Sequence, residues 1–193
     1  MFEVRIHGRG GQGVVTAAEL LSVAAFLEGR HAQAFPSFGS ERTGAPVVAY
    51  CRIADKPIRT REPIVAPDAL IVQDPTLLHQ VAVFEGLRPD GYLLINSAKP
   101  VAELDIAEVT GRLRAERLLV VPATQLAQRI LGRPVPNAVL LGGIAAASGV
   151  VSVGSVTAAI RERFSGSIAE RNVAAAEEAF TFVQNEIREM AHA

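Results

Sequence analysis

The sequence of 193 residues contains a single cysteine, Cys51. One thiol cannot form an internal disulfide, and it cannot hold an iron–sulfur cluster alone, because such clusters are bound by four protein thiolates. Cys51 also falls on the more apolar side of a predicted strand, where a buried small residue is the simplest interpretation. If the protein takes part in redox chemistry, the electrons must pass through another chain.

The sequence also lacks an excess of charge of either sign. It has 19 lysines and arginines against 20 acidic residues, a formal net charge of −1. This argues against a polybasic surface that binds nucleic acid or a membrane. No basic segment followed by a long apolar one stands at the start, and the most apolar run, residues 138–151, is too short to span a bilayer. We expect a cytoplasmic protein in which any anion site is local.

Common catalytic patterns are missing too. There is no nucleophile elbow, no Cys/His pairing and no plausible carboxylate pair, and the histidines share no metal-binding spacing: they are His7, His31, His79 and His192. His7 shares the polar side of a predicted first strand with Glu3 and Arg5. We expect this side to face solvent or an interface. We expect a binding protein with no catalytic residue and no metal ligand of its own.

What the sequence does have is a glycine-rich segment near its start, Gly8-Arg9-Gly10-Gly11-Gln12-Gly13. It follows an alternating run at residues 2–6, a predicted strand, and precedes residues 14–28, a predicted helix. Such a loop lets the chain turn without side-chain clashes and leaves backbone N–H groups at the helix N-terminus to hold an anion. The expected ligand is a phosphate group.

Three of these glycines, Gly8, Gly10 and Gly13, match the G-x-G-x-x-G spacing of dinucleotide-binding proteins. That fingerprint also needs an acidic residue about 20 positions further on, at the end of the second strand. Residues 31–36 occupy that place and contain no acid. A stand-alone Rossmann-type oxidoreductase that uses NAD or FAD therefore stays only as an alternative, beside a scaffold whose glycine loop merely turns tightly.

Strand and helix patterns predict one α/β domain over residues 1–193, with a doubly wound, mostly parallel sheet. Several continuous apolar runs are typical of strands covered on both faces: residues 69–72, 91–95 and 118–121. Residues 47–54 alternate, and residues 58–61 are expected to return as their antiparallel partner, which gives an inserted β-hairpin.

The last third of the chain is expected to be helical. Asn137 is predicted to cap a helix over residues 138–147, and Gly142-Gly143 would let a neighbouring helix approach closely. A second helix is expected over residues 155–164. A capping box at residues 167–170 would open the last helix, which runs to about residue 190.

Ligands of open α/β sheets bind at the carboxyl ends of the strands, where the strand order reverses. The glycine loop, the loop at residues 37–45, Asp74 and Asn96-Ser97 are all predicted to lie there, which indicates a binding cleft. Asp74 before Pro75 could equally be a helix cap. Asn96-Ser97 could equally be a turn.

Three motifs together resemble the gamma subunit of 2-oxoacid:ferredoxin oxidoreductases, with pyruvate:ferredoxin oxidoreductase the nearest: residues 8–13, 37–47 and 52–58. They occur in the right order and spacing, and the similarity covers nearly the whole chain. The resemblance implies partner chains: alpha, beta and ferredoxin-like delta subunits. These would carry thiamine diphosphate with Mg²⁺ and [4Fe-4S] clusters, and they would pass electrons to ferredoxin or another acceptor.

The reaction implied by the resemblance is oxidative decarboxylation of a 2-oxoacid with coenzyme A to acyl-CoA and CO₂. Pyruvate is the expected substrate, with 2-oxoglutarate, branched-chain 2-oxoacids and phenylglyoxylate as alternatives. This subunit would help to close the active site and to bind coenzyme A, a cosubstrate in a shared site, without holding any cofactor alone.

The expected coenzyme A contacts are phosphate contacts, made by the amides of residues 10–13 and by the guanidinium groups of Arg9 and Arg42, because a guanidinium can hold two phosphate oxygens at once. The candidate binding residues are Gly8, Arg9, Gly10, Gly11, Gln12, Gly13, Ser37, Phe38, Gly39, Ser40, Glu41, Arg42 and Asn96.

Overall fold

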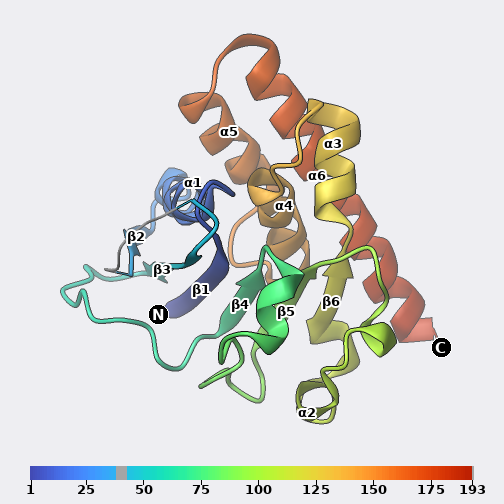
Figure 1. The fold of residues 1–193 in the computed structure, drawn as a ribbon. Helices are drawn as coiled ribbons and strands as arrows, with labels where there is room; N and C mark the ends of the chain where they lie inside the picture. The colour runs from blue at the N-terminus through green and yellow to red at the C-terminus, as the bar shows by residue number, and fades with distance from the viewer. Residues whose placement is uncertain (38–42, 193) are drawn as a thin grey trace.

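The computed structural model describes residues 1–37 and 43–192; residues 38–42 and residue 193 lie outside the described part. Its sheet has the strand order β2-β3-β1-β4-β5-β6 (Figure 1). The strands are β1 Phe2–Arg9, β2 His31–Pro36, β3 Pro46–Ala54, β4 Ala69–Val72, β5 Tyr92–Asn96 and β6 Leu118–Val121. β1, β4, β5 and β6 are parallel neighbours, whereas β3 runs antiparallel between β1 and β2. The predicted α/β fold with a mostly parallel sheet is confirmed.

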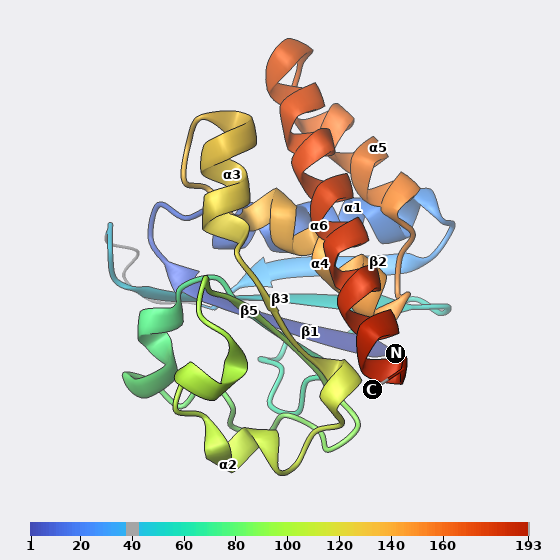
Figure 2. The ribbon, with the colours of Figure 1, turned by 90° about the vertical axis from the view of Figure 1, so that its right-hand side faces the viewer.

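Helices cover the two faces of the sheet unequally (Figures 1 and 2). The longer helices share one apolar core with one face: α1 Val14–Leu27, α3 Ala123–Leu131, α4 Asn137–Ser148, α5 Val153–Arg163 and α6 Gly166–His192. The short helices η1 Pro75–His79, η2 Val101–Glu103 and α2 Ala107–Thr110 lie on the other face, and η3 Ala115–Arg117 leads into β6. Within the described residues, none of the helices is both long and apolar enough to cross a bilayer.

The antiparallel insertion differs from the sequence-based prediction. Residues 46–54 do form a strand, but its partners are β1 and β2, so that Cys51 lies opposite Val4 on one side and Ala34 on the other. The expected returning strand, residues 58–61, is irregular. Both edges of β3 are already paired, and the prolines that flank this segment cannot donate ladder hydrogen bonds. The pairing of residues 47–54 with residues 58–61 was therefore wrong.

The polar side of β1, expected to face solvent or an interface, is buried within this chain. Arg5 and His7 are each only 7% exposed. The guanidinium of Arg5 donates to the carbonyl oxygens of Ile64 and Val83, at 3.3 and 2.9 Å. Chain segments remote in sequence cross this side of the sheet. The predicted exposure of this side was wrong, because the alternation of residues within one strand does not show whether another chain segment packs over it.

Burial of His7 should make the protein sensitive to acid. Desolvation lowers the pKa of His7 to about 4, and the charge of Arg5 adds to the effect. The unfolded chain takes up this proton near pH 6.5, so between about pH 6.5 and 4 it binds more protons than the folded chain does. The stabilisation from neutral His7 is thus complete above pH 6.5 and is lost as the pH falls toward 4.

Acidification from pH 6.5 to 4 should lower the free energy of unfolding of the parent more than that of His7→Phe. We expect the two losses to differ by about 2–3 kcal/mol, because phenylalanine has no proton to bind. Urea unfolding at each pH measures the difference. The same replacement at the exposed His31 is the control. An equal acid response in the parent and in both variants would contradict the prediction.

Helix α4 is packed between the sheet and α6. A Cβ atom on Gly142 would lie 1.9 Å from the carbonyl oxygen of Ala176 in α6, and one on Gly143 would lie 3.1 Å from a methyl group of Leu94 in β5. Two backbones can approach this closely only where the side chain is missing. The close helix approach predicted at these glycines is confirmed.

The starts of the C-terminal helices differ from the prediction in detail. Ser152 caps α5, which begins at Val153 and not at residue 155. Asn137 is the first residue of α4 and not the residue before it, and its Oδ1 accepts from the amide of Ala138 at 2.8 Å. The carboxylate of Glu170 accepts from Nε and Nη2 of Arg161, both at 2.9 Å, so it does not close the expected capping box. Each of the two bonds joins opposite charges, whereas a capping bond would join the carboxylate to a single backbone amide.

Candidate functional site

A pocket of about 440 Å³ lies at the carboxyl end of β1, above the N-terminus of α1. Its lining consists of the glycine loop, the first turn of α1 and the start of the β3 region: Arg9, Gly10, Gly11, Gly13, Val14, Val15, Thr16, Thr43 and Val47. Two of the lining residues, Gly10 and Thr43, are paired by an isolated β-bridge. The structure therefore brings the glycine loop and the end of the 37–45 loop together, as the sequence predicted.

Backbone amides are the principal donors of this pocket. Those of Gly10 and Gln12 are already used, because they donate to Ala45 at 2.9 Å and to Arg9 at 3.1 Å. The amides of Gly11, Gly13 and residues 14–16 donate to no backbone acceptor among the described residues. Gly13 provides no side-chain cap for the helix. A cluster of amides at a helix N-terminus is a site for an anion.

Two loop glycines are required by the backbone itself. Gly11 and Gly13 have φ angles of +93° and +72°, a region that other residues rarely adopt. A Cβ on Gly13 would also lie 2.5 Å from Nδ2 of Asn137 at the start of α4. Gly8 has a packing role instead, because a Cβ there would lie 2.5 Å from a methyl group of Val14. The loop therefore packs so closely against α1 and α4 that no side chain can be accommodated at Gly8 or Gly13.

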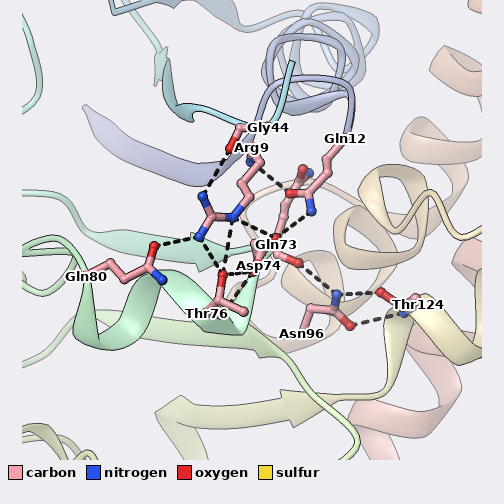
Figure 3. A network of polar contacts seen from close by, with 9 residues as sticks. All are labelled: Arg9, Gln12, Gly44, Gln73, Asp74, Thr76, Gln80, Asn96 and Thr124. Carbon is pink, nitrogen blue, oxygen red and sulfur yellow. Dashed lines mark hydrogen bonds and ion pairs between the residues drawn. The ribbon is translucent and has the colours of Figure 1, made fainter. Parts of the chain in front are cut away.

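Arg9 is held within the chain by a network of polar contacts (Figure 3). Its guanidinium donates to Gly44 O at 3.0 Å, to Thr76 Oγ1 at 2.7 Å and to Gln80 Oε1 at 2.6 Å. Its Nε also lies 3.3 Å from Asp74 Oδ2. The guanidinium ties the segment after residue 42 to η1, and its proposed contact with a phosphate stays a prediction.

Asp74 organises the same network. It caps η1 by accepting from the amide of Thr76 at 3.0 Å, with Pro75 at the first helical position, as the capping interpretation predicted. Its other oxygen accepts from Gln12 Nε2 at 2.7 Å. Burial opposes ionisation of this carboxyl, but the hydrogen bonds from Thr76 and Gln12 and the charge of Arg9 outweigh it and lower its pKa.

Asn96 uses its side chain inside the protein. Its Nδ2 donates to Gln73 O and to Thr124 Oγ1, both at 2.7 Å, and its Oδ1 accepts from the amide of Thr124 at 3.0 Å. The side chain thereby joins the ends of β4 and β5 to the start of α3. Ser97 Oγ accepts from the amide of Lys99, as in a turn. The candidate contact of Asn96 with coenzyme A stays a prediction.

Only part of the 37–45 loop can be placed. The amide of Ser37 donates to Val48 O at 2.8 Å, which fixes the beginning of the loop at the carboxyl edge of the sheet. Phe38, Gly39, Ser40, Glu41 and Arg42, all candidates from the sequence, lie outside the described residues. The described end of the loop, Thr43 to Ala45, lines or supports the amide pocket.

Residues 3–182 match the family described as pyruvate ferredoxin/flavodoxin oxidoreductase. The chain belongs to this family. A gamma subunit shared by pyruvate and ketoisovalerate oxidoreductases of Pyrococcus abyssi is 48% identical over 184 residues, which cover 95% of this chain and 98% of that one. The pyruvate synthase subunit PorC of Methanocaldococcus jannaschii is 47% identical over 180 residues, covering 93% and 96%.

A solved structure of a family member has the same fold. The pyruvate oxidoreductase subunit PORC of Thermotoga maritima superposes with a TM-score of 0.78 at 35% identity, and the match covers 93% of this chain and 95% of that one. The resemblance to gamma subunits that the three sequence motifs predicted is confirmed.

The sheet of this chain differs from that of a dinucleotide-binding protein in the position of its second strand. The dinucleotide fingerprint uses an acid at the end of a second strand that lies beside the first. In this family member β3 separates β1 from β2, and β2 ends without an acid. The described residues therefore lack both the strand arrangement and the acid that the dinucleotide fingerprint requires.

Cys51 is fully buried in this family member, and burial raises the pKa of its thiol to about 12. A thiol of that kind is neutral and cannot serve as a metal ligand or nucleophile. In the part of the chain that the structure describes, no three His, Cys, Asp or Glu side chains gather in a way that would hold a metal ion.

Sequence reasoning missed two contributors to the pocket. Residues 14–16 supply amides because they form the first turn of α1, whose amides have no acceptor within the helix. The predicted start of the helix at residue 14 was enough to identify them. Thr43 lines the pocket because its backbone pairs with Gly10. That pairing joins residues 33 positions apart and has no local signal.

Proposed function

We propose that the chain is the gamma subunit of a cytoplasmic, thiamine diphosphate- and iron–sulfur-dependent 2-oxoacid:ferredoxin oxidoreductase. The complex would oxidise a 2-oxoacid with coenzyme A to acyl-CoA and CO₂ and pass two electrons to ferredoxin or another acceptor. Pyruvate is the first candidate substrate and 3-methyl-2-oxobutanoate (ketoisovalerate) the second, in line with the names of the relatives. Alpha, beta and ferredoxin-like subunits would supply the thiamine chemistry and the clusters.

The contribution of this chain would be to hold a phosphate of coenzyme A. The observation that carries the proposal is the row of amides at Gly11, Gly13 and residues 14–16, which face a pocket and donate to no backbone acceptor among the described residues. Coenzyme A brings several phosphate charges, and a chain of net charge −1 can receive them only at such a local site. Thiamine and cluster chemistry need groups that Cys51 and its surroundings do not offer.

The polar network behind the pocket would keep these amides in place. Gln12 Oε1 accepts from the amide of Arg9 at 2.8 Å while its Nε2 donates to Asp74, so the loop is held from both ends. A donor set that is fixed before the anion arrives loses little entropy on binding. Arg9 also lines this pocket, with its guanidinium held by Gly44 and Thr76 and its charge paired with Asp74.

A charge placed in the pocket tests the proposal. Thr43 lines the pocket and its side chain is exposed, so Thr43→Glu should repel a phosphate without disturbing the fold. Thr43→Gln has nearly the same shape and no charge, and it serves as the matched control. In the assembled complex we expect the glutamate variant to have a KM for coenzyme A roughly tenfold above that of the glutamine variant, about 1–2 kcal/mol.

The first half-reaction provides the second readout. Decarboxylation of the 2-oxoacid with one-electron reduction of the clusters needs no coenzyme A, so both variants should retain it. Equal KM values for coenzyme A in the two variants would show that no phosphate binds near Thr43. Loss of the half-reaction in the glutamate variant alone would place the pocket at the 2-oxoacid site instead.

A further inference from the structure

A second pocket, of about 400 Å³, reaches Thr16 in the first turn of α1. It is formed where the connection from α3 to α4 meets the turn between α5 and α6. Figure 2 shows the start of α6 at the top of the molecule, with α3 and α5 to its sides. Thr16 lines both this pocket and the amide pocket, so the two are neighbours.

The rim of this pocket is strongly basic. Arg133, Arg163 and Arg171 line it, and no aspartate or glutamate does. Among the described residues none of the three arginines forms an ion pair, whereas the neighbouring Arg161 is paired with Glu170. The amides of the first turn of α6 lie at the same end, where a helix favours negative charge. Such a rim suits a phosphate, because each guanidinium presents a planar fork of donors.

The walls and the base of the pocket suit a ring with an amino group. Phe164 and Ile168 are among the apolar side chains of the walls. At the base, Asn172 is only 5% exposed, and its Nδ2 donates to Ile168 O at 2.8 Å. Its Oδ1 accepts no hydrogen bond from a described residue, although the residue lines the pocket. The oxygen is not enclosed by protein atoms, so it is open to an N–H group of a ligand in the pocket.

We propose that this pocket binds a phosphorylated adenosine unit. The adenine ring would lie between the apolar walls, its 6-amino group would donate to Asn172 Oδ1, and the phosphate would lie at the arginine rim. A volume of about 400 Å³ is in the range of small-ligand sites. Two sources share this chemistry: a free adenosine nucleotide, and the adenosine 3′,5′-bisphosphate end of coenzyme A.

Binding of adenosine 3′,5′-bisphosphate to the full chain, measured by calorimetry, tests the site. Arg171→Gln and Arg133→Gln should each weaken binding roughly tenfold or more, since each removes a charge-assisted contact. Arg188→Gln, at the far end of α6, removes the same charge away from the pocket and should leave affinity unchanged. Inorganic phosphate alone should bind at least tenfold more weakly than the bisphosphate, because it cannot use the walls or Asn172.

Three results would overturn the proposal. These are no binding of the bisphosphate by the parent chain at millimolar concentration, equal affinities in the Arg171 and Arg188 variants, and inorganic phosphate as tight as the bisphosphate. A merely misfolded variant is recognised by its circular dichroism. Asn172→Leu then checks the base of the pocket, and it should weaken the bisphosphate while leaving inorganic phosphate unaffected.

Coenzyme A distinguishes the two sources. If coenzyme A displaces the bisphosphate and itself binds more weakly to Thr43→Glu, one molecule occupies both pockets. If coenzyme A does not displace it, the ligand is a free nucleotide and the pocket is a separate site. Either outcome supports the pocket. The site assignment also stands apart from the proposed function, because the KM comparison at Thr43 can fail while the bisphosphate still binds.

Discussion

Gly142→Ala is expected to lower the free energy of unfolding by about 3 kcal/mol or more, although alanine is normally the better helix former. The new methyl group would lie 1.9 Å from the carbonyl oxygen of Ala176. The methyl carbon is fixed directly to the backbone of α4 and the oxygen belongs to the backbone of α6, so no side-chain rotation relieves the clash. Either α6 moves away from α4 or α4 is pressed into the sheet, and each movement opens gaps in a close-packed core.

Two further variants make this prediction specific. Gly143→Ala meets the methyl group of Leu94 at 3.1 Å, a flexible neighbour, and should cost about 1 kcal/mol. Gly154→Ala lies in the first turn of α5 with only Ser152 Oγ nearby, at 3.8 Å, and should be neutral or slightly stabilising. Urea unfolding of the three variants measures the order. A Gly142 variant as stable as the Gly154 variant would show that α4 and α6 do not pack as described.

Replacement of Gly142 should also affect the amide pocket, because α4 contacts the glycine loop. The first residue of α4, Asn137, lies with its Nδ2 3.5 Å from Gly13 O, and a Cβ at Gly13 would collide with it. A shift of α4 is therefore transmitted to the residue that precedes the first turn of α1. We accordingly attribute the apolar character of α4 to its position between the sheet, α6 and the glycine loop.

Features determined by neighbouring residues were predictable from the sequence. The strand, glycine loop and helix at residues 2–28 follow from local alternation and from the distribution of glycine. Asp74 before Pro75 was recognised as a cap because capping is a contact between adjacent residues. The glycines at 142 and 143 indicated a close helix approach because only glycine permits one.

Features determined by distant residues were not predictable. The partner of β3 depends on which strands reach its edges, and the burial of Arg5 depends on the chain segments that cross β1. The arginine-rimmed pocket collects Arg133, Arg163 and Arg171 from three separate segments, and none of them has a local motif. The contacts of Arg9 with Gly44 and with η1 were not predictable either, because they join residues more than 30 positions apart.

Asp74 is the residue of the candidate site whose replacement should destabilise the chain most. It is 8% exposed and receives donors from Thr76, Gln12 and Arg9. In Asp74→Asn the new amide group would face two of those donors, and the charge of Arg9 would lose its counter-ion. Removing one member of a mostly buried pair costs about 3 kcal/mol. Asp55→Asn is the control, because that ion pair with Arg30 is exposed and should contribute less than about 1 kcal/mol.

A double-mutant cycle separates the pairing of Asp74 with Arg9 from the other contacts of either residue. We expect Arg9→Gln and Asp74→Asn to be destabilising alone, and the double variant to be more stable than the sum of the two effects by about 1–2 kcal/mol. The same variants should raise the KM for coenzyme A in the complex, since Gln12 and Gly44 lose their attachment and the amides of the loop are no longer held in place. Strictly additive stabilities, together with an unchanged KM, would mean that the network neither couples these residues nor positions the loop.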